Sequence, residues 1–200
     1  MLYNVSMLEI ENVRINGYNA LVNTSNGTLK VKDSIIVSSN QAINNSGTLS
    51  VDGTNITGTN YAFYNNSTVA NTISNSTLTS SSNAIYKNNS SETTILNTTI
   101  KGSVTNSKST GILNITGGET GNTITGSMSN TGKANIIGMT ISYSSDYHSH
   151  EQAINNSGVM KLEKSTVNIT NRLTYSRDDS TRAILNNGTL TSIESVYNSK

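Results

Sequence analysis

Hydrophobic residues occur along the whole chain in short groups, and clusters of Gly, Asn, Asp and Ser separate these groups. Within a group, apolar and polar residues alternate, as in Leu49-Ser50-Val51. Because successive side chains of a strand point to opposite faces, Leu49 and Val51 would share one face. Short alternating groups between turn signals predict short β-strands.

One phrase, Ala-apolar-x-Asn-(Asn)-x-Gly-Thr-Leu-x-Val, recurs along the chain. Its copies start at Ala42, Ala153 and Ala183, more loosely at Ala20, Ala62 and Ala84, and in degenerate form near Val104 and Met128, after a truncated copy at Met7. From Ala20 to Ala183 the successive starts are 22, 20, 22, 20, 24, 25 and 30 residues apart. Repetition at such a period is typical of solenoids. The chain thus contains nine units.

A single unit of this size cannot bury its apolar residues, whereas stacked units share one narrow core. The unit at Ala42 has three apolar segments, which are Ala42-Ile43, then Leu49 and Val51, then Ile56. We predict an all-β fold, a right-handed parallel β-helix (β-solenoid) of about nine coils of 20–30 residues with three short strands per coil. The right-handed sense is favoured because left-handed helices tend to use stricter hexapeptide units. At ~4.8 Å per coil the rod would be roughly 40 Å long.

Asparagine recurs directly after the first strand of the unit, on the inward-facing parity. The matching residues are Asn45, Asn65, Asn156 and Asn186. Stacked amides can donate to the next coil and can satisfy the backbone of the turn, so we predict a structural asparagine ladder. In the copy Ala84-Ile85-Tyr86-Lys87-Asn88-Asn89 the asparagine is displaced by one residue. A bulge or a longer turn is expected there.

Composition excludes several classes of protein. Asn, Ser, Thr and Gly dominate, Pro, Cys and Trp are absent, 12% of residues are charged, and the formal net charge is +1. A disordered tract would have few β-branched residues, whereas Ile, Val and Thr are spread over this whole chain. The near-zero charge argues against a nucleic-acid partner, and the absence of Cys rules out a disulfide framework.

The chain carries no recognisable targeting segment. Residues 1–5 lack the basic and apolar regions of a signal peptide, and no apolar run approaches the length needed to span a membrane. We therefore expect residues 1–200 to be a single parallel β-helix domain, a fragment of a longer repeat protein, without direct membrane insertion. Neighbouring repeats of the parent chain would then be among its partners.

The phrases Ala-Ile-Asn-Asn-Ser-Gly-Thr-Leu at Ala42 and Ala-Ile-Leu-Asn-Asn-Gly-Thr-Leu at Ala183 resemble pectate-lyase-like parallel β-helix proteins. More closely, they resemble the Asn/Thr/Ser-rich repeats of adhesin-like surface proteins from bacteria and archaea. The resemblance spans nearly the whole chain, but it is weak for function because this fold serves adhesins, phage tailspikes and polysaccharide-cleaving enzymes. It implies an extracellular location, at the cell surface or secreted.

Two expanded segments, 142–152 and 171–182, interrupt the uniform composition. They hold both His, three of the four Arg, three of the five Asp and three of the nine Tyr. Equivalent positions stack in a solenoid, so the segments should project side by side as a ledge that binds carbohydrate or a host or cell-surface protein. The alternative is that they are merely solvated loops. The candidate ligand-binding residues are Tyr143, Asp146, Tyr147, His148, His150, Arg172, Tyr175, Arg177, Asp178, Asp179 and Arg182.

The ledge also contains the only plausible metal ligands. His148 and His150 would share a face of an extended segment, and Asp146 or Glu151 could complete a site. Since a third firm ligand is missing, we predict no metal and no cofactor.

Catalysis on a polysaccharide would need convergent carboxylates, and Asp146, Asp178 and Asp179 form the only cluster. The resemblance to polygalacturonase-type β-helices implies His148 and Arg177 as their companions. The Gly-His-Gly and Arg-Ile-Lys segments of that family are missing, as is the calcium-binding acidic cluster of a lyase. We expect no catalytic residues, and hence a non-catalytic surface adhesin or spacer module. The alternative is a phage tailspike-like or polysaccharide-processing enzyme.

Overall fold

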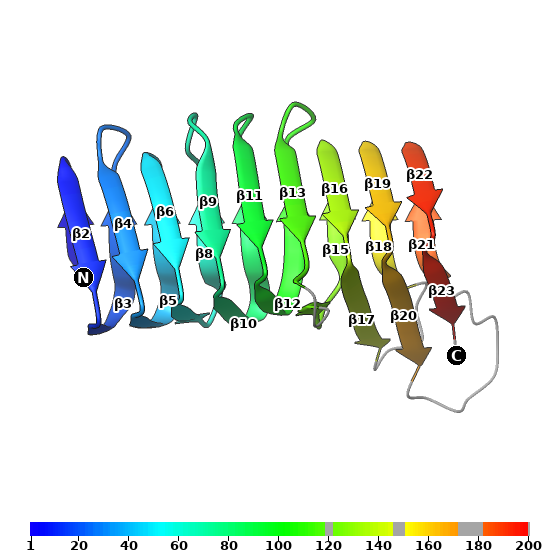
Figure 1. Cartoon of the computed structure of the whole chain (residues 1–200), viewed down its shortest axis with the longest axis horizontal. Helices are drawn as coiled ribbons and strands as arrows, with labels where there is room; N and C mark the ends of the chain where they lie inside the picture. The colour runs from blue at the N-terminus through cyan, green and yellow to red at the C-terminus, as the bar shows by residue number, and fades with distance from the viewer. Residues whose placement is uncertain (119–121, 146–150, 172–181, 200) are drawn as a thin grey trace.

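A computed structural model describes residues 1–118, 122–145, 151–171 and 182–199. In this part the chain is all-β and winds into a parallel β-solenoid of about seven turns with two main parallel sheets. The strands lie side by side along the long axis, and the two chain ends lie at opposite ends of the rod (Figure 1).

One sheet contains nine strands among the described residues, one from each sequence unit. They are β2 (Met7–Glu11), β4 (Thr28–Lys32), β6 (Thr48–Asp52), β9 (Asn71–Ser74), β11 (Glu92–Leu96), β13 (Ile112–Thr116), β16 (Lys133–Ile137), β19 (Val159–Glu163) and β22 (Thr189–Ile193). β2 and β22 have a neighbour on one side only. The solenoid has about seven turns, so the prediction of nine coils is wrong in number, although each of the nine units contributes a strand to this sheet.

The other sheet has 14 strands in the described ranges. They are β1 (Leu2–Asn4), β3 (Arg14–Asn23), β5 (Ile35–Asn45), β7 (Asn55–Gly58), β8 (Tyr61–Asn65), β10 (Thr77–Lys87), β12 (Thr99–Asn106), β14 (Asn122–Ile124), β15 (Met128–Asn130), β17 (Met139–Ser145), β18 (Gln152–Asn156), β20 (Thr166–Asn171), β21 (Arg182–Asn186) and β23 (Val196–Ser199). Two of the three predicted segments run together in β3, β5 and β10, with register shifts at the bend. Each turn is thus built from two main sheets.

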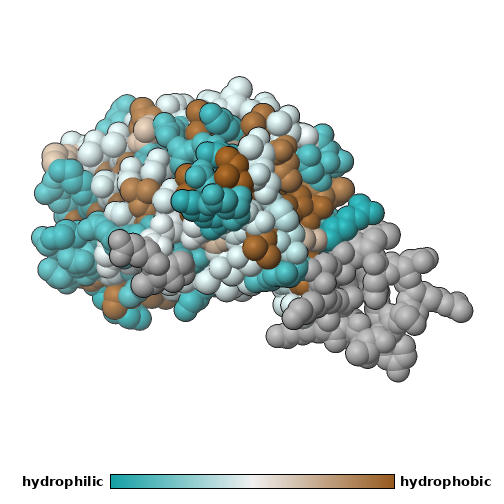
Figure 2. All heavy atoms as spheres, turned by 45° about the vertical axis from the view of Figure 1, so that its right-hand side comes forward, coloured by the Kyte–Doolittle hydropathy of each residue, from teal (hydrophilic) through white to brown (hydrophobic). Residues whose placement is uncertain are grey.

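The core consists of hydrophobic columns that run along the rod. In one column Leu21, Ile43, Phe63 and Ile85 pair across successive turns, and each is at most 1% exposed. Alternate residues face outward and give a surface on which hydrophilic and neutral residues predominate (Figure 2). In-register parallel stacking places like residues on one another. The continuous core predicted from the repeats is confirmed.

Inward-facing asparagines form a ladder beside these columns. The Nδ2 of Asn23 donates to the Oδ1 of Asn45 at 2.7 Å, and the Nδ2 of Asn45 donates to the Oδ1 of Asn65 at 3.2 Å. Further along, the Nδ2 of Asn156 donates to the Oδ1 of Asn186 at 2.7 Å. The members are Asn4, Asn23, Asn45, Asn65, Asn106, Asn130, Asn156 and Asn186. The ladder predicted from four of these positions is confirmed and extends over eight.

One lysine takes a place in this ladder. Lys87 pairs with Asn65 and Asn106 in unbroken register and is fully buried at 0% exposure. Burial lowers the pKa of its ammonium group to about 8. The longer turn predicted here is present, because four residues separate Lys87 from β11 whereas two separate Asn45 from β6, and the lysine itself fills the asparagine position. The register shifts of β10 lie before this position, between Thr79 and Ile85.

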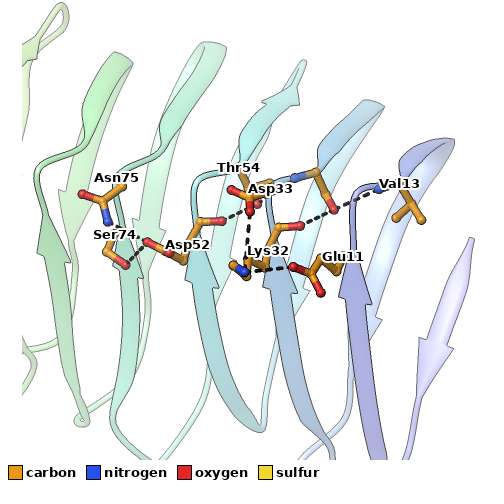
Figure 3. A network of polar contacts seen from close by, with 9 residues as sticks. Glu11, Val13, Lys32, Asp33, Asp52, Thr54, Ser74 and Asn75 are labelled. Carbon is orange, nitrogen blue, oxygen red and sulfur yellow. Dashed lines mark hydrogen bonds and ion pairs between the residues drawn. The ribbon is translucent and has the colours of Figure 1, made fainter.

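A second polar column lines the corner after the nine-stranded sheet. The residue that follows the strand has a left-handed backbone in most turns, with φ of 54° at Asn12, 45° at Asp33, 59° at Gly53, 50° at Asn75, 44° at Asn97, 64° at Gly138, 49° at Lys164 and 49° at Glu194. The next residue often carries a hydroxyl that accepts an N–H from the preceding turn. The Oγ of Ser34 accepts from Val13, and the Oγ of Ser76 accepts from Thr54 at 3.0 Å. Figure 3 shows the bond to Val13 and the side chains around this corner.

Candidate binding trough

The outward side chains of β17, β20 and β23 form a polar row toward the C-terminal end of the rod, where these strands lie side by side (Figure 1). Ser142, Asn168 and Asn198 are in register. The Nδ2 of Asn198 donates to the Oδ1 of Asn168 at 2.8 Å, and the Nδ2 of Asn168 donates to the Oγ of Ser142 at 3.5 Å. The parallel register thus repeats hydrogen-bonding groups at the strand spacing on the outside of the rod.

A hollow of about 640 Å³ lies along this row. It is lined by Thr125, Ser142, Tyr143, Ser144, Asn168, Ile169, Thr170 and Asn198. A second hollow of about 450 Å³ is lined by Thr79, Ser80, Ser81, Ser82, Lys101, Gly102, Ser103, Thr125, Gly126, Ser142, Tyr143 and Ser144. The two share Thr125 and Ser142–Ser144, so we describe them together as the trough. The trough crosses the strands from β10 to β23, which is about 24 Å at ~4.8 Å per strand spacing.

The trough offers mainly neutral hydrogen-bonding groups. Serine and threonine hydroxyls and asparagine amides each both donate and accept. Lys101, which is exposed, is the charged residue among the lining side chains given above. A ligand that fits this lining needs many hydroxyl or amide groups and no strong charge.

Tyr143 contributes an aromatic ring at the junction of the two hollows. Its side chain is half-buried and packs against the hydrophobic core. Its hydroxyl donates to the Oε2 of Glu151 at 3.0 Å. These contacts hold the side chain of Tyr143 in place among the residues that line both hollows.

The predicted ledge is described by the structure only in part. Tyr143 lines the trough, whereas Arg182 is exposed at the start of β21 and is not among the lining residues of either hollow. Ser145 pairs with Asn171, so the two expanded segments leave adjacent turns at equivalent positions. The other predicted residues lie outside the described residues, namely Asp146, Tyr147, His148, His150, Arg172, Tyr175, Arg177, Asp178 and Asp179.

An aromatic cluster on the outer face of β8 and β10 was not predicted from the sequence. The rings of Tyr64 and Tyr86 are stacked with centroids 5.5 Å apart, and Tyr61 meets each of them edge-on at 5.4 Å. All three are half-buried. The signal was present, because Tyr64 and Tyr86 occupy the same position of successive units. The rings largely cover one another, so little of their surface is left to bind a ligand. Their role is to stabilise the packing of neighbouring turns.

The acidic side chains at the N-terminal end have fixed basic or amide partners. Lys32 lies 2.8 Å from Glu11 and 3.8 Å from Asp33, and the hydrogen bond with Glu11 raises the pKa of the lysine (Figure 3). Hydrogen bonds from Asn75 at 2.7 Å and Ser74 at 2.8 Å lower the pKa of Asp52. Exposed pairs of this kind contribute little stability.

The structure gives no support to a metal centre within the residues that it describes. Over these ranges no group of three or more His, Cys, Asp or Glu side chains is placed to hold an ion. The pair His148 and His150 lies outside them. The same ranges contain no helix long and apolar enough to cross a membrane.

Comparison with known proteins finds no matching family model, curated protein or solved structure. The fold and the site therefore rest on the geometry described above. That geometry is a parallel β-solenoid with an asparagine ladder in its interior and an elongated neutral trough on its surface.

Proposed function

We propose that the protein is a non-catalytic, rigid binding module that holds a neutral glycan chain along the trough. The observation that carries this proposal is the repetition of like polar groups along the rod, as in the row Ser142, Asn168 and Asn198. A site that repeats at a constant spacing suits a ligand that is itself a repeating polymer. Glycans are rich in hydroxyl groups that both donate and accept, as the lining does.

The ring of Tyr143 complements this polar lining. A sugar ring has an apolar face of C–H groups as well as polar edges, and an aromatic side chain offers a flat apolar partner for such a face. The ring is fixed by its core contact and by the hydrogen bond to Glu151, so little conformational entropy is lost when a ligand binds. Tyr143 is thus the main apolar contact of the proposed site.

The resemblance to adhesin-like repeats supports an extracellular setting for this module, at a cell surface or secreted. A stiff rod would there hold its ligand away from the surface that carries it, and a host or cell-surface protein is the other partner that this reading allows. We also propose that the rod winds in the right-handed sense, as the length of the units predicts.

A polysaccharide-processing enzyme or a tailspike is the alternative. The carboxylates on which it would depend, Asp146, Asp178 and Asp179, lie outside the described residues. Glu151 meets the trough through Tyr143, but a single carboxylate does not supply both the acid and the base that glycoside cleavage needs. The described part of the trough therefore supports binding without cleavage.

Binding to an array of neutral and acidic glycans, followed by calorimetry with the best ligand, tests the proposal. We expect neutral polysaccharides to bind, and we expect Tyr143→Ala and Asn168→Ala each to weaken binding about tenfold or more. Asn114→Ala is the matched control, because Asn114 accepts a similar amide contact from Asn135, at 2.7 Å, on the other sheet. Equal affinity in all variants would contradict the trough as the site. New reducing ends in the incubated glycan would show that the module is catalytic.

A further inference from the structure

The connections that follow the asparagine ladder differ in length from turn to turn. Two residues, 46–47, join β5 to β6, whereas four residues, 24–27, join β3 to β4 and five residues, 66–70, join β8 to β9. Figure 1 shows the connections into β4 and β9 as loops that rise above the rod, while the connection into β6 stays low. Among the connections of this kind that the structure describes, 46–47 is the only short one with a longer loop on each side.

A hollow of about 490 Å³ lies at this low turn, and we call it the loop pocket. One loop contributes Thr24 and Ser25 to its lining, and the other contributes Asn66 and Thr68. The low turn contributes Ser46. The loop pocket shares no lining residue with the trough, which begins at a later turn. Binding sites for small molecules usually have a volume of this order.

The polar side chains of the loop pocket are not used by the fold. In the part of the chain that the structure describes, no side-chain hydrogen bond is made by Thr24, Ser25, Ser46, Asn66 or Thr68. Their hydroxyl and amide groups each both donate and accept. A ligand in the pocket can therefore engage several groups without breaking a contact of the folded chain.

Equivalent side chains of later turns are engaged within the fold. Asn88 and Ser107 directly follow the ladder positions of their turns, as Ser46 and Asn66 do. The Oγ of Ser107 donates to the Oδ1 of Asn88 at 3.0 Å and to the backbone oxygen of Lys87 at 3.0 Å. Unused polar groups are thus a feature of the loop pocket and not of this surface column as a whole.

The loops that form the walls of the pocket are held by hydrogen bonds of their own. The Oγ of Ser67 accepts the N–H of Val69 at 3.1 Å, and the Nδ2 of Asn71 donates to the backbone oxygen of Val69 at 2.8 Å. In the other loop the N–H of Gly27 donates to the backbone oxygen of Thr24 at 2.9 Å. Walls that are ordered in advance lose little conformational entropy when a ligand binds.

We propose that the loop pocket is a second binding site of this protein and that it holds one residue of a neutral sugar. None of the residues that line the pocket is charged, which disfavours an ionic ligand. Val22, which is half-buried, adds an apolar contact to the hydroxyl and amide groups. A sugar ring carries hydroxyl groups and C–H groups together, as this lining requires. The inference does not rest on the trough, because the two sites have no residue in common.

Nuclear magnetic resonance titration of the whole, isotope-labelled chain with glucose, galactose, mannose and N-acetylglucosamine tests this site. At least one of these sugars should shift the backbone amide signals of Thr24, Ser46 and Asn66 in a saturable way. The dissociation constant should be on the order of a few millimolar, as expected for a ligand of this size. The absence of saturable shifts at these residues for every sugar, up to about 100 mM, would overturn the proposal.

A pair of matched variants tests whether the sugar occupies the pocket itself. Ser46→Tyr fills the low turn and should weaken binding at least tenfold. Ser157→Tyr is the control, because Ser157 stands in the same Asn-Asn-Ser-Gly sequence and its turn, 157–158, has a two-residue connection on each side. It should bind the sugar like the wild type. Equal affinity in the two variants would refute the loop pocket as the site.

Smaller changes test the contacts with the second loop. Thr68→Val keeps the shape of the side chain and removes its hydroxyl, and Asn66→Ala removes the amide. Each should weaken binding about three- to tenfold, the effect of one lost hydrogen bond. Unchanged affinity in both variants would mean that this loop does not hold the sugar, contrary to the proposal.

The same titration separates this inference from the glycan-binding trough. Tyr143→Ala should leave the shifts at the loop pocket unchanged. Shifts confined to Ser142, Asn168 and Asn198 would leave the trough in place and refute the second site. Shifts confined to the loop pocket would support the second site and count against the trough.

Discussion

The ammonium group of Lys87 donates to both oxygen atoms of Asn89, to the backbone oxygen at 2.8 Å and to Oδ1 at 2.9 Å. These contacts replace those of an asparagine at this position of the ladder. The Nδ2 of Asn65 turns instead to the Oγ1 of Thr93 at 2.9 Å, and the buried Oδ1 of Asn106 has no hydrogen-bond partner in the part of the chain that the structure describes. The lysine thus interrupts the ladder on both sides, and the dipoles of the two Asn89 oxygen atoms stabilise its ammonium group, with no carboxylate among these contacts.

Stability should increase as the pH rises through the titration of Lys87. The folded protein releases the proton of Lys87 near pH 8, whereas the unfolded chain keeps it up to about pH 10.5. Between these values the unfolded state binds more protons, so the free energy of unfolding rises with pH, by at most on the order of 3 kcal/mol. Urea denaturation between pH 7 and 10.5 measures this change.

Lys87→Met is the comparison for that experiment, because it keeps the buried stem and removes the ammonium group. Other titrating groups are common to both proteins, so the difference between the two unfolding free energies isolates Lys87. This difference should move in favour of the wild type as the pH rises. A difference that is constant from pH 7 to 10.5 would contradict a lowered pKa of Lys87.

Removing one amide from the ladder should destabilise the protein strongly. The Nδ2 of Asn45 donates to the backbone oxygen of Gly47 at 2.9 Å and to the Oδ1 of Asn71 at 3.1 Å, in addition to its ladder contact. In Asn45→Ala these buried groups lose their partners, and we expect a loss of about 3 kcal/mol in urea denaturation. Asn44→Ala, on the outward side of the same strand, should change stability by less than about 0.5 kcal/mol. Similar losses in both variants would mean that the ladder is not the source of the stability.

The turn glycine of the repeated phrase should be required for steric reasons. A Cβ atom at Gly158 would lie 2.1 Å from the backbone oxygen of Gly132 in the preceding turn. Because both atoms belong to packed backbone, Gly158→Ala should force neighbouring turns apart and lower the free energy of unfolding by about 2 kcal/mol or more. Thermal denaturation of Gly158→Ala beside Gly188→Ala, at the less covered C-terminal turn, measures the effect. A wild-type melting temperature for Gly158→Ala would refute this explanation.

At the corner after the nine-stranded sheet, the left-handed backbone conformation limits stability. Lys164 has a φ of 49°, and the equivalent residue of the preceding turn is Gly138 with a φ of 64°. A left-handed backbone is unfavourable for a residue with a side chain and neutral for glycine, so Lys164→Gly should raise the free energy of unfolding by about 1 kcal/mol. Gly138→Ala should lower it by a similar amount, since the nearest atom to the added Cβ is 4.0 Å away and steric conflict is absent. Changes of the same sign in the two variants would contradict this account.

The parts of the fold that repeat in the sequence could be predicted from it. The alternation in Leu49-Ser50-Val51 was sufficient to assign an inward face, and Asn45 and Asn156 at equal positions were sufficient to predict the ladder. The two sheets were not foreseen as such. Whether two segments join into one strand, as in β5, depends on hydrogen bonding between turns, which the sequence of a single unit does not express.

Other features could not be predicted because their cause lies in neighbouring turns. A lysine is expected at the surface, and only the stacking of Lys87 between Asn65 and Asn106 places it inside. The trough likewise depends on how β17 and β20 pack against earlier turns, although Tyr143 was identified as a candidate. The hydroxyl column could have been found, since Ser34 and Thr54 each follow a strand by two residues.

The in-register columns make whole units interchangeable. If residues 20–41 were removed, Asn4 would stack on Asn45, Leu8 on Leu49 and Ile10 on Val51, so each new neighbour would match the old one in kind. Shifting a strand by one residue would instead bring an amide into an aliphatic column. Recombination between repeats can therefore shorten or lengthen such a rod by whole turns while the contacts of its core stay the same. The length of the rod is then a property that selection can adjust.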